Sequence, residues 1–163
     1  MPGNRAIFFD RDGVLIHEDG EYTFTPEKLK INEGAVDFLG EVKKRGYLLF
    51  VITNQGGVGK GLYTKDDVVN MHALLQKTFD KAGVHIEKYL VCVHHPISSN
   101  CLCRKPESLL LERAIALYDL DVKASYLIGD RDRDVEAARR TGINPLLVTS
   151  NSSLFTILDA IKY

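Results

Sequence analysis

The chain has 163 residues, 45% of them hydrophobic, and a formal net charge of −1. This composition predicts one globular domain with its own core, and the charge gives no reason to expect a nucleic-acid or membrane partner. No apolar run approaches the ~20 residues that span a bilayer, the N-terminus lacks a secretion signal, and three cysteines fit a disulfide framework poorly. We therefore expect a monomeric, cytoplasmic, single-domain protein over residues 1–163, with reduced thiols.

Short apolar runs alternate with helical patterns along the chain. Runs that are apolar at nearly every position are typical of parallel strands covered on both faces. They are found at residues 5–9, 47–53, 88–93, 125–129 and 145–150. Helical spacing is found at residues 33–46, 64–83, 107–120 and 134–142. The alternation predicts an α/β fold, a doubly wound parallel sheet in three layers.

Ligands of such sheets bind beyond the carboxyl ends of the strands. After the first run, Asp10 and Asp12 are separated by one residue, and Gly13 permits a sharp turn. Two bare carboxylates this close repel each other, and a hard divalent cation such as Mg²⁺ would relieve the repulsion. A simple Asx-type turn explains the same residues equally well.

The second run ends at Thr53, and four glycines follow within eight residues. Backbone N–H groups in such a loop can cradle an anion. The loop does not have the Walker ending, because Lys60 is followed by Gly61. A merely flexible glycine-rich loop is the alternative.

All three cysteines lie within residues 92–103, at the end of the third run and in the segment after it, interleaved with two histidines. Its pattern, C-x-H…C-x-C, offers four ligands that suit tetrahedral Zn²⁺, and a closed set of four is typical of a structural site. These residues are Cys92, His94, Cys101 and Cys103. The alternative is four unrelated residues of one loop.

Two cationic residues, Arg104 and Lys105, follow the last cysteine directly. Pro106 is suited to open the next helix, which would place Lys105 at a helix N-terminus, where it would hold phosphate well. If zinc orders the loop, it also fixes both cations. A solvated loop arginine is the alternative for Arg104.

The fourth run ends at Asp130, with Asp132 and Asp134 beyond it. Acidic residues ahead of a helix either hold a metal or cap the helix. For Asp134 two interpretations stay open, that it orients neighbours around the metal or that it only caps the following helix, and we interpret Asp132 as a solvated surface charge. The strand ends together carry an ordered series: Asp-x-Asp, Thr, Lys and Asp. Four unrelated structural roles, one at each strand end, explain this order poorly.

These motifs resemble those of the haloacid dehalogenase (HAD) superfamily of phosphohydrolases. FFDRDGVLI is similar to its first motif, VITN to its second, Lys105 in CRKP to its third, and LIGDRDRD to its fourth. With the Cys/His loop they resemble subclass IIIA, the branch that contains heptose bisphosphate phosphatases and histidinol-phosphate phosphatases. The chain has no large insertion that would form the separate cap domain of many relatives.

The resemblance implies a Mg²⁺-dependent phosphomonoester hydrolase with an aspartyl-phosphate intermediate. Asp10 would be the nucleophile, and Asp12 the general acid and then the base. Thr53 and Lys105 would hold phosphoryl oxygens. Mg²⁺ would be bound by Asp10, the backbone carbonyl of Asp12, and Asp130.

The resemblance also implies where a small phosphorylated substrate binds. These residues are Asn54, Gln55, Gly56, Arg104, Lys105 and Arg131. The segment NQGGVGKG is similar to that of the heptose bisphosphate enzymes, so a sugar phosphate is expected, whereas GDR and EKLKINEG are more similar to the histidinol-phosphate enzymes. A zinc-stabilised binding module on an inactive HAD fold stays open, as does a phosphatase for nucleic-acid ends, which the neutral charge disfavours.

The remaining histidines and two aromatic residues have weaker signals. We interpret His72 as a helix-surface residue, and His17 and His85 as loop residues. His95 would crowd a metal already bound by its neighbour, so we exclude it from the zinc ligands. Tyr22 and Phe24 either wall the substrate pocket or only pack.

Overall fold

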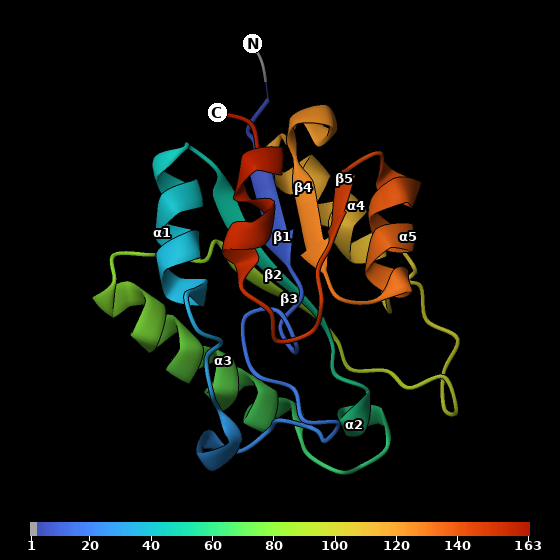
Figure 1. Cartoon of the computed structure of the whole chain (residues 1–163). Helices are drawn as coiled ribbons and strands as arrows, with labels where there is room; N and C mark the ends of the chain where they lie inside the picture. Colours follow the sequence, from blue (N-terminus) through green and yellow to red (C-terminus); the bar gives the residue numbers. More distant parts are fainter. Residues whose placement is uncertain (1–2) are drawn as a thin grey trace.

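The structure is a computed structural model, and it describes residues 3–163. Five strands form one parallel sheet in the order β3-β2-β1-β4-β5. The strands are β1 (Ala6–Phe9), β2 (Leu48–Asn54), β3 (Lys88–Cys92), β4 (Tyr126–Gly129) and β5 (Asn144–Leu147). Every expected strand is present, and the predicted doubly wound α/β sheet is confirmed (Figure 1).

Helices cover both faces of the sheet and make the three layers. One face packs against α1 (Ala35–Lys44), α3 (Lys65–Lys81) and the 3₁₀-helix η3 (Leu154–Ala160). The other face packs against α4 (Leu109–Tyr118) and α5 (Asp132–Thr141). The remaining short elements are η1 (Pro26–Lys28), α2 (Gly56–Gly59) and η2 (Val122–Ala124).

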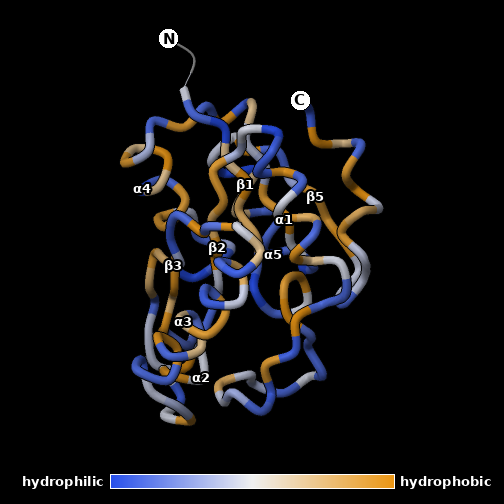
Figure 2. Tube along the Cα trace, turned by 90° about the vertical axis from the view of Figure 1, so that its left-hand side faces the viewer, coloured by the Kyte–Doolittle hydropathy of each residue, from blue (hydrophilic) through white to orange (hydrophobic). Residues whose placement is uncertain are grey.

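Strand β1 shows why these runs are apolar throughout. Its side chains alternate between the two cores: Ile7 and Phe9 enter one, Ala6 and Phe8 the other, and all four are fully buried. The Phe8 ring stacks on that of Phe50 in β2, with centroids 4.9 Å apart. Burying one large apolar side chain contributes about 1.5–3 kcal/mol. Figure 2 shows the hydrophobic residues along the strands inside the molecule and hydrophilic residues in many of the loops.

Because all five strands are parallel, their carboxyl ends lie at the same end of the sheet. The loops that follow the strands, including α2, gather at that end of the molecule (Figure 1). In the described part of the chain, no helix is both long and apolar enough for a membrane span.

Two expected boundaries are wrong. Helix α4 begins at Leu109 rather than at Pro106. Both backbone groups of Lys105 are engaged by the side chain of Asn54, at 3.0 and 3.1 Å, so this part of the chain stays a turn and cannot start a helix. Strand β5 ends at Leu147, three residues earlier than expected.

Candidate active site

A polar cavity of about 250 Å³ opens at the carboxyl ends of the central strands. Asp10, Arg11 and Asp12, which follow β1, form one wall. Asn54 and Gln55, at the end of β2, form another. The loop after β1 closes it, with Glu18 and the segment 20–23, and Arg133 from the first turn of α5 completes the lining.

Asp10 and Lys105 form a buried ion pair beneath this cavity. Lys105 Nζ lies 2.9 Å from Asp10 Oδ1 and 2.6 Å from Asp134 Oδ1, and it donates to the carbonyl of Ile52 at 2.9 Å. Burial raises the pKa of Asp10 to about 7; Lys105 lowers it, whereas Asp134 and Asp12 add to the rise. Burial alone would lower the pKa of Lys105, but the two carboxylates raise it above its ordinary value. The lysine is therefore a cation with all three donors engaged.

Three carboxylates of this region lie close enough to hold one cation. Oxygens of Asp10, Asp130 and Asp134 are all within 4.8 Å of one another. Neither buried oxygen of Asp130 has a hydrogen-bond partner among residues 3–163. Burial raises its pKa, against the opposing effects of the Ser150 hydroxyl and Arg131. An orphaned buried carboxylate beside two others is the oxygen donor set that Mg²⁺ prefers.

Asp134 caps α5, one of the two roles that the sequence left open, and it also pairs with Lys105. Its Oδ1 pairs with Lys105, and its Oδ2 accepts from the backbone N–H of Arg131 at 3.1 Å, which caps α5. Asp132 is exposed on the same helix, as expected. One side chain thus fixes both the lysine and the helix start.

Asp12 does not join the carboxylate cluster. Its side chain turns to the neighbouring guanidinium of Arg11, which donates to both of its oxygens at 3.0 Å. The amide of Gln55 also donates to Asp12, at 3.1 Å. The Gly13 turn beside it has a φ of +81°, and an added Cβ there would lie 2.4 Å from an oxygen of Asp130, so glycine is required.

The end of β2 brings its predicted residues together. Thr53 is buried, and its hydroxyl accepts from Gln55 Nε2 at 2.7 Å. Asn54 holds the backbone of Lys105. The glycines beyond form the short helix α2 rather than an open loop.

Four predicted substrate residues do not line the cavity. One of them is Lys105, which lies beneath it, paired with Asp10. Gly56 is buried against Arg104 and His95. Arg104 donates to the carbonyl of His94 at 3.3 Å and lines a separate hollow of about 190 Å³ beside the cysteine loop. Arg131 pairs with Glu18 at 2.7 Å and lies 3.5 Å from Asp130 at the rim.

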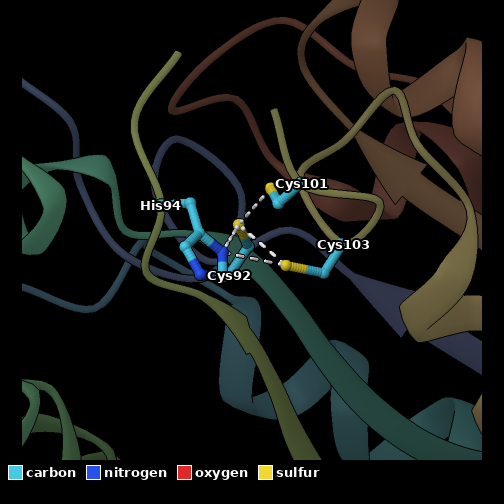
Figure 3. Close-up of side chains that lie close together, drawn as sticks. All are labelled: Cys92, His94, Cys101 and Cys103. Carbon is cyan, nitrogen blue, oxygen red and sulfur yellow. Dashed lines mark hydrogen bonds between the residues drawn. The ribbon is translucent and has the colours of Figure 1, made fainter. Parts of the chain in front are cut away.

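The four predicted zinc ligands converge. Figure 3 shows their side chains turned toward one another from the end of β3 and the returning loop. Cys92 Sγ lies 3.6 Å from Cys101 Sγ and 3.3 Å from Cys103 Sγ, and His94 Nδ1 lies 3.2 Å from Cys103 Sγ. Tetrahedral zinc with Zn–S bonds of 2.3 Å requires sulfurs about 3.8 Å apart. The observed sulfur separations are shorter than this, and the four ligand atoms converge within 4.8 Å of one another, as one shared metal requires.

Protonation of these thiols depends on their surroundings. Burial raises the pKa of Cys92 to about 12. Burial also acts to raise the pKa of Cys101, but backbone N–H groups of Cys103 and Arg104 outweigh it and lower that pKa. The cluster holds protons that a metal would displace.

One histidine prediction is wrong. His72 is only 7% exposed, and its ring stacks on Tyr89 with centroids 4.6 Å apart. Its Nε2 lies 3.4 Å from Arg11 Nη1. The sequence could have predicted that His72 is buried, because its helical spacing places it on the same face of α3 as Val68 and Leu75. His95 is half-buried and lies outside the ligand set, as expected.

Sequence reasoning also missed residues that shape the cavity. Ser150 and Asn151, which follow β5, contact Glu18. Their only signal is their place after the fifth strand, the one strand end to which we assigned no residue. Tyr22 lines the cavity, and Phe24 stacks on Tyr63 at 4.8 Å instead.

Known proteins resemble this chain over most of its length. A family model described as HAD-hydrolase-like matches residues 102–160. The D-glycero-alpha-D-manno-heptose-1,7-bisphosphate 7-phosphatase of Burkholderia mallei is 35% identical over 151 residues, which are 89% of this chain and 79% of that protein. The histidine biosynthesis bifunctional protein HisB of Legionella pneumophila is 30% identical over 96% of this chain. This chain covers only 45% of that relative, so it spans less than half of its length.

A solved structure shares the fold closely. It is the D,D-heptose 1,7-bisphosphate phosphatase of B. bronchiseptica, complexed with magnesium and phosphate. The TM-score is 0.85 at 26% sequence identity, and the match covers 90% of this chain and 82% of that one.

Proposed function

Because this chain belongs to the haloacid dehalogenase superfamily of phosphohydrolases, we propose that it is the phosphatase that removes the 7-phosphate of D-glycero-D-manno-heptose 1,7-bisphosphate. The observation that carries the proposal is the buried cluster of Asp10, Lys105, Asp130 and Asp134 beneath a polar cavity, with Asp12 at its wall. A carboxylate that is held by a cation and opens on a cavity is the arrangement that attack on phosphorus requires.

Asp10 is the nucleophile of the first step. One of its oxygens forms a bond to phosphorus as the bond to the leaving oxygen breaks, and Asp12 gives that oxygen a proton. In the second step Asp12 takes a proton from the water that attacks the aspartyl phosphate. Lys105, 2.9 Å from Asp10, and the Thr53 hydroxyl balance the charge that spreads over the phosphoryl oxygens.

The carboxylates of Asp10 and Asp130 would hold Mg²⁺, with Asp134 beside them. The backbone carbonyl of Asp12 would be a further ligand, as the family resemblance implies. When bound, Mg²⁺ offsets the repulsion between an anionic nucleophile and an anionic phosphate. Asp134 keeps Lys105 in place, and Lys105 in turn holds Asp10 toward the reacting centre.

The names of the relatives support a heptose bisphosphate as the substrate. The cavity is polar, and its lining of carboxylates, amides and Arg133 suits a phosphorylated polyhydroxyl compound. Arg131 at the rim and Arg104 beyond it supply charge for the second phosphate. Histidinol phosphate is the second candidate, supported by the Legionella relative, of which this chain matches less than half.

Zinc belongs to the proposal as a structural metal. Cys92, His94, Cys101 and Cys103 supply a closed set of four converging ligands, the number and kind that structural zinc takes. The ion would order the loop that carries Arg104 and Lys105.

The nucleophile is tested by the variant Asp10→Asn. Hydrolysis of an aryl phosphate in the presence of Mg²⁺ is expected to fall at least ~10³-fold, because an amide cannot attack phosphorus. The exposed Asp132→Asn on α5 is the matched control and should keep full activity. Turnover by Asp10→Asn at the wild-type rate would refute the proposal.

The substrate is tested with a panel of phosphorylated metabolites. Both anomers of heptose 1,7-bisphosphate should give the highest kcat/KM, and histidinol phosphate should be at least ~10-fold poorer. A preference for histidinol phosphate would replace the first candidate by the second.

A further inference from the structure

Arg11 lies between the two aspartates in sequence, yet its side chain is 1% exposed. Its guanidinium donates through Nε and Nη2 to the two oxygens of Asp12, each at 3.0 Å. Nη2 also donates to the carbonyl of Thr23 at 3.0 Å and to Gln55 Oε1 at 3.1 Å. A buried bidentate pair of this kind fixes both the distance and the plane of the carboxylate.

Gln55 connects this pair to the phosphate end of the site. Its Nε2 donates to Asp12 at 3.1 Å and to the Thr53 hydroxyl at 2.7 Å. Its Oε1 accepts from the Tyr63 hydroxyl at 2.8 Å as well as from Arg11. One amide therefore sets the position of Asp12 relative to Thr53.

His72 holds the far side of the guanidinium. Arg11 Nη1 can only donate, so His72 Nε2, 3.4 Å away, is the acceptor, and the ring is neutral. Burial and the Arg11 charge together lower the pKa of His72 to about 3, against the opposing effect of Asp12. Tyr89 fixes the ring by stacking, so α3 and β3 support Arg11 from outside the cavity.

We propose that Arg11, held by His72 and Gln55, is a positioning residue that aims the carboxyl group of Asp12 at the leaving oxygen of the substrate. The inference rests on the proposed function, in which Asp12 gives its proton to that oxygen. The Arg11 side chain donates to Asp12, Thr23 and Gln55, whereas its backbone N–H donates to Asp10 Oδ1 at 2.9 Å, a contact that side-chain substitutions leave in place. It acts through the orientation of Asp12 only.

The dependence on the leaving group separates this role from a purely structural one. Phenyl phosphate and 2,4-dinitrophenyl phosphate are similar in shape, but only the phenolate of the first needs a proton as it leaves. Proton transfer by a positioned group contributes about 10²–10⁴-fold. A misplaced Asp12 therefore slows the first substrate and spares the second.

The experiment measures kcat/KM for both aryl phosphates with Mg²⁺ in the variants Arg11→Met and Arg11→Lys. Arg11→Met should lower kcat/KM about 10²-fold for phenyl phosphate and less than about 5-fold for the dinitrophenyl ester. Arg11→Lys keeps the charge but loses the planar fork, so it should show the same pattern. Equal losses on both substrates would overturn the proposal.

Two further variants keep the test decisive. If Arg11→Met does not fold, His72→Phe keeps the stacking on Tyr89 and removes the acceptor, and it should lower phenyl phosphate turnover selectively by about 5–10-fold. Arg139→Met, on the exposed face of α5, should change neither substrate. Equal rates on both substrates in His72→Phe and wild type would also overturn it.

Failure of the proposed function is recognised separately. Asp12→Asn must itself give the leaving-group pattern if Asp12 is the acid. If Asp12→Asn gives this pattern and the Arg11 variants do not, only the positioning role is refuted. If Asp12→Asn leaves both substrates equally affected, the acid assignment fails, and the Arg11 proposal falls with it.

Discussion

A neutral histidine lies in the polar network behind the cavity. His72 is enclosed by Arg11, which lies 3.4 Å away, by the stacked ring of Tyr89, and by the nearby charge of Asp12. Its pKa of about 3 is below the ordinary value of 6.5 because burial and the arginine disfavour the imidazolium. Protonation of this ring therefore opposes the folded state.

The free energy of unfolding should depend on pH because of this titration. The pKa is lowered in the folded state, so the contribution is complete above pH 6.5 and is lost as the pH falls toward 3. Between pH 7 and pH 5 the wild type should lose about 2 kcal/mol through this group. Urea unfolding at both pH values measures the loss.

The variant His72→Gln should lose that part of the pH dependence, since glutamine accepts a hydrogen bond but does not titrate here. His85→Gln, which changes an exposed loop histidine, is the control and should keep the wild-type slope. An unchanged slope in His72→Gln would contradict the assignment.

Individual residues were predictable where their type fixed their chemistry. Asp10 and Asp130 directly follow apolar runs, Lys105 follows the cysteine loop, and the structure brings the three together. Arg11 was not predicted, because a charged residue in a loop usually faces solvent, and only the three-dimensional arrangement shows that its guanidinium is buried.

At the scale of elements, the chain beyond β5 fastens the loop beyond β1. Asn151 adopts a φ of +61°, and its backbone N–H donates to the carbonyl of Gly13 at 2.7 Å. Its side chain accepts from the N–H of Glu18 at 2.8 Å and donates to the carbonyl of the same residue at 2.7 Å. The loop that closes the cavity is thereby held to the sheet.

The variant Asn151→Gly tests this fastening. Glycine tolerates the positive φ but removes both side-chain hydrogen bonds, each worth about 0.5–1.5 kcal/mol. KM should rise about 5–20-fold with little change in kcat, since Glu18 and its neighbours line the cavity while Asp10 is untouched.

Ser152→Gly is the matched control, because the Ser152 side chain makes no hydrogen bond within residues 3–163. Its kinetics should equal those of the wild type. A normal KM in Asn151→Gly would show that the loop after β1 keeps its position without the two side-chain hydrogen bonds of Asn151.

The cysteine loop packs against α2 as well as reaching the site. A Cβ added to Gly59 would lie 2.7 Å from the backbone nitrogen of His95, and one added to Gly56 would lie 3.0 Å from Arg104. Disorder in the cysteine loop therefore removes support from the segment that begins with Gln55.

Metal analysis and chelation test the zinc proposal. Purified protein should contain about one equivalent of zinc, and Cys101→Ser or a chelator should lower Tm by several degrees, by roughly 4 °C for each kcal/mol lost. Turnover should fall because Lys105 follows the loop directly. Protein that is free of zinc and equally stable would remove this metal from the proposal.

At the scale of the whole molecule, the sheet and its edge were predictable from alternation alone. Apolar runs of strand length separated by amphipathic helices leave few arrangements, and parallel strands place their carboxyl ends together. The walls of the cavity were not predictable, because they depend on pairs such as Asn151 and Glu18, which are 133 residues apart. No periodic pattern in the sequence predicts such a contact. The short helix α2 was not predicted either, because three of its four residues are glycine, which has a low helix propensity.

Every strand ends in a residue on which the site or its supports depend: Asp10 after β1, Gln55 after β2, Cys92 on β3, Asp130 after β4 and Asn151 after β5. A partly formed sheet should therefore have no hydrolytic activity. During refolding, activity should return in a single phase that coincides with docking of the last edge strand, so the recovery of turnover reports when folding is complete.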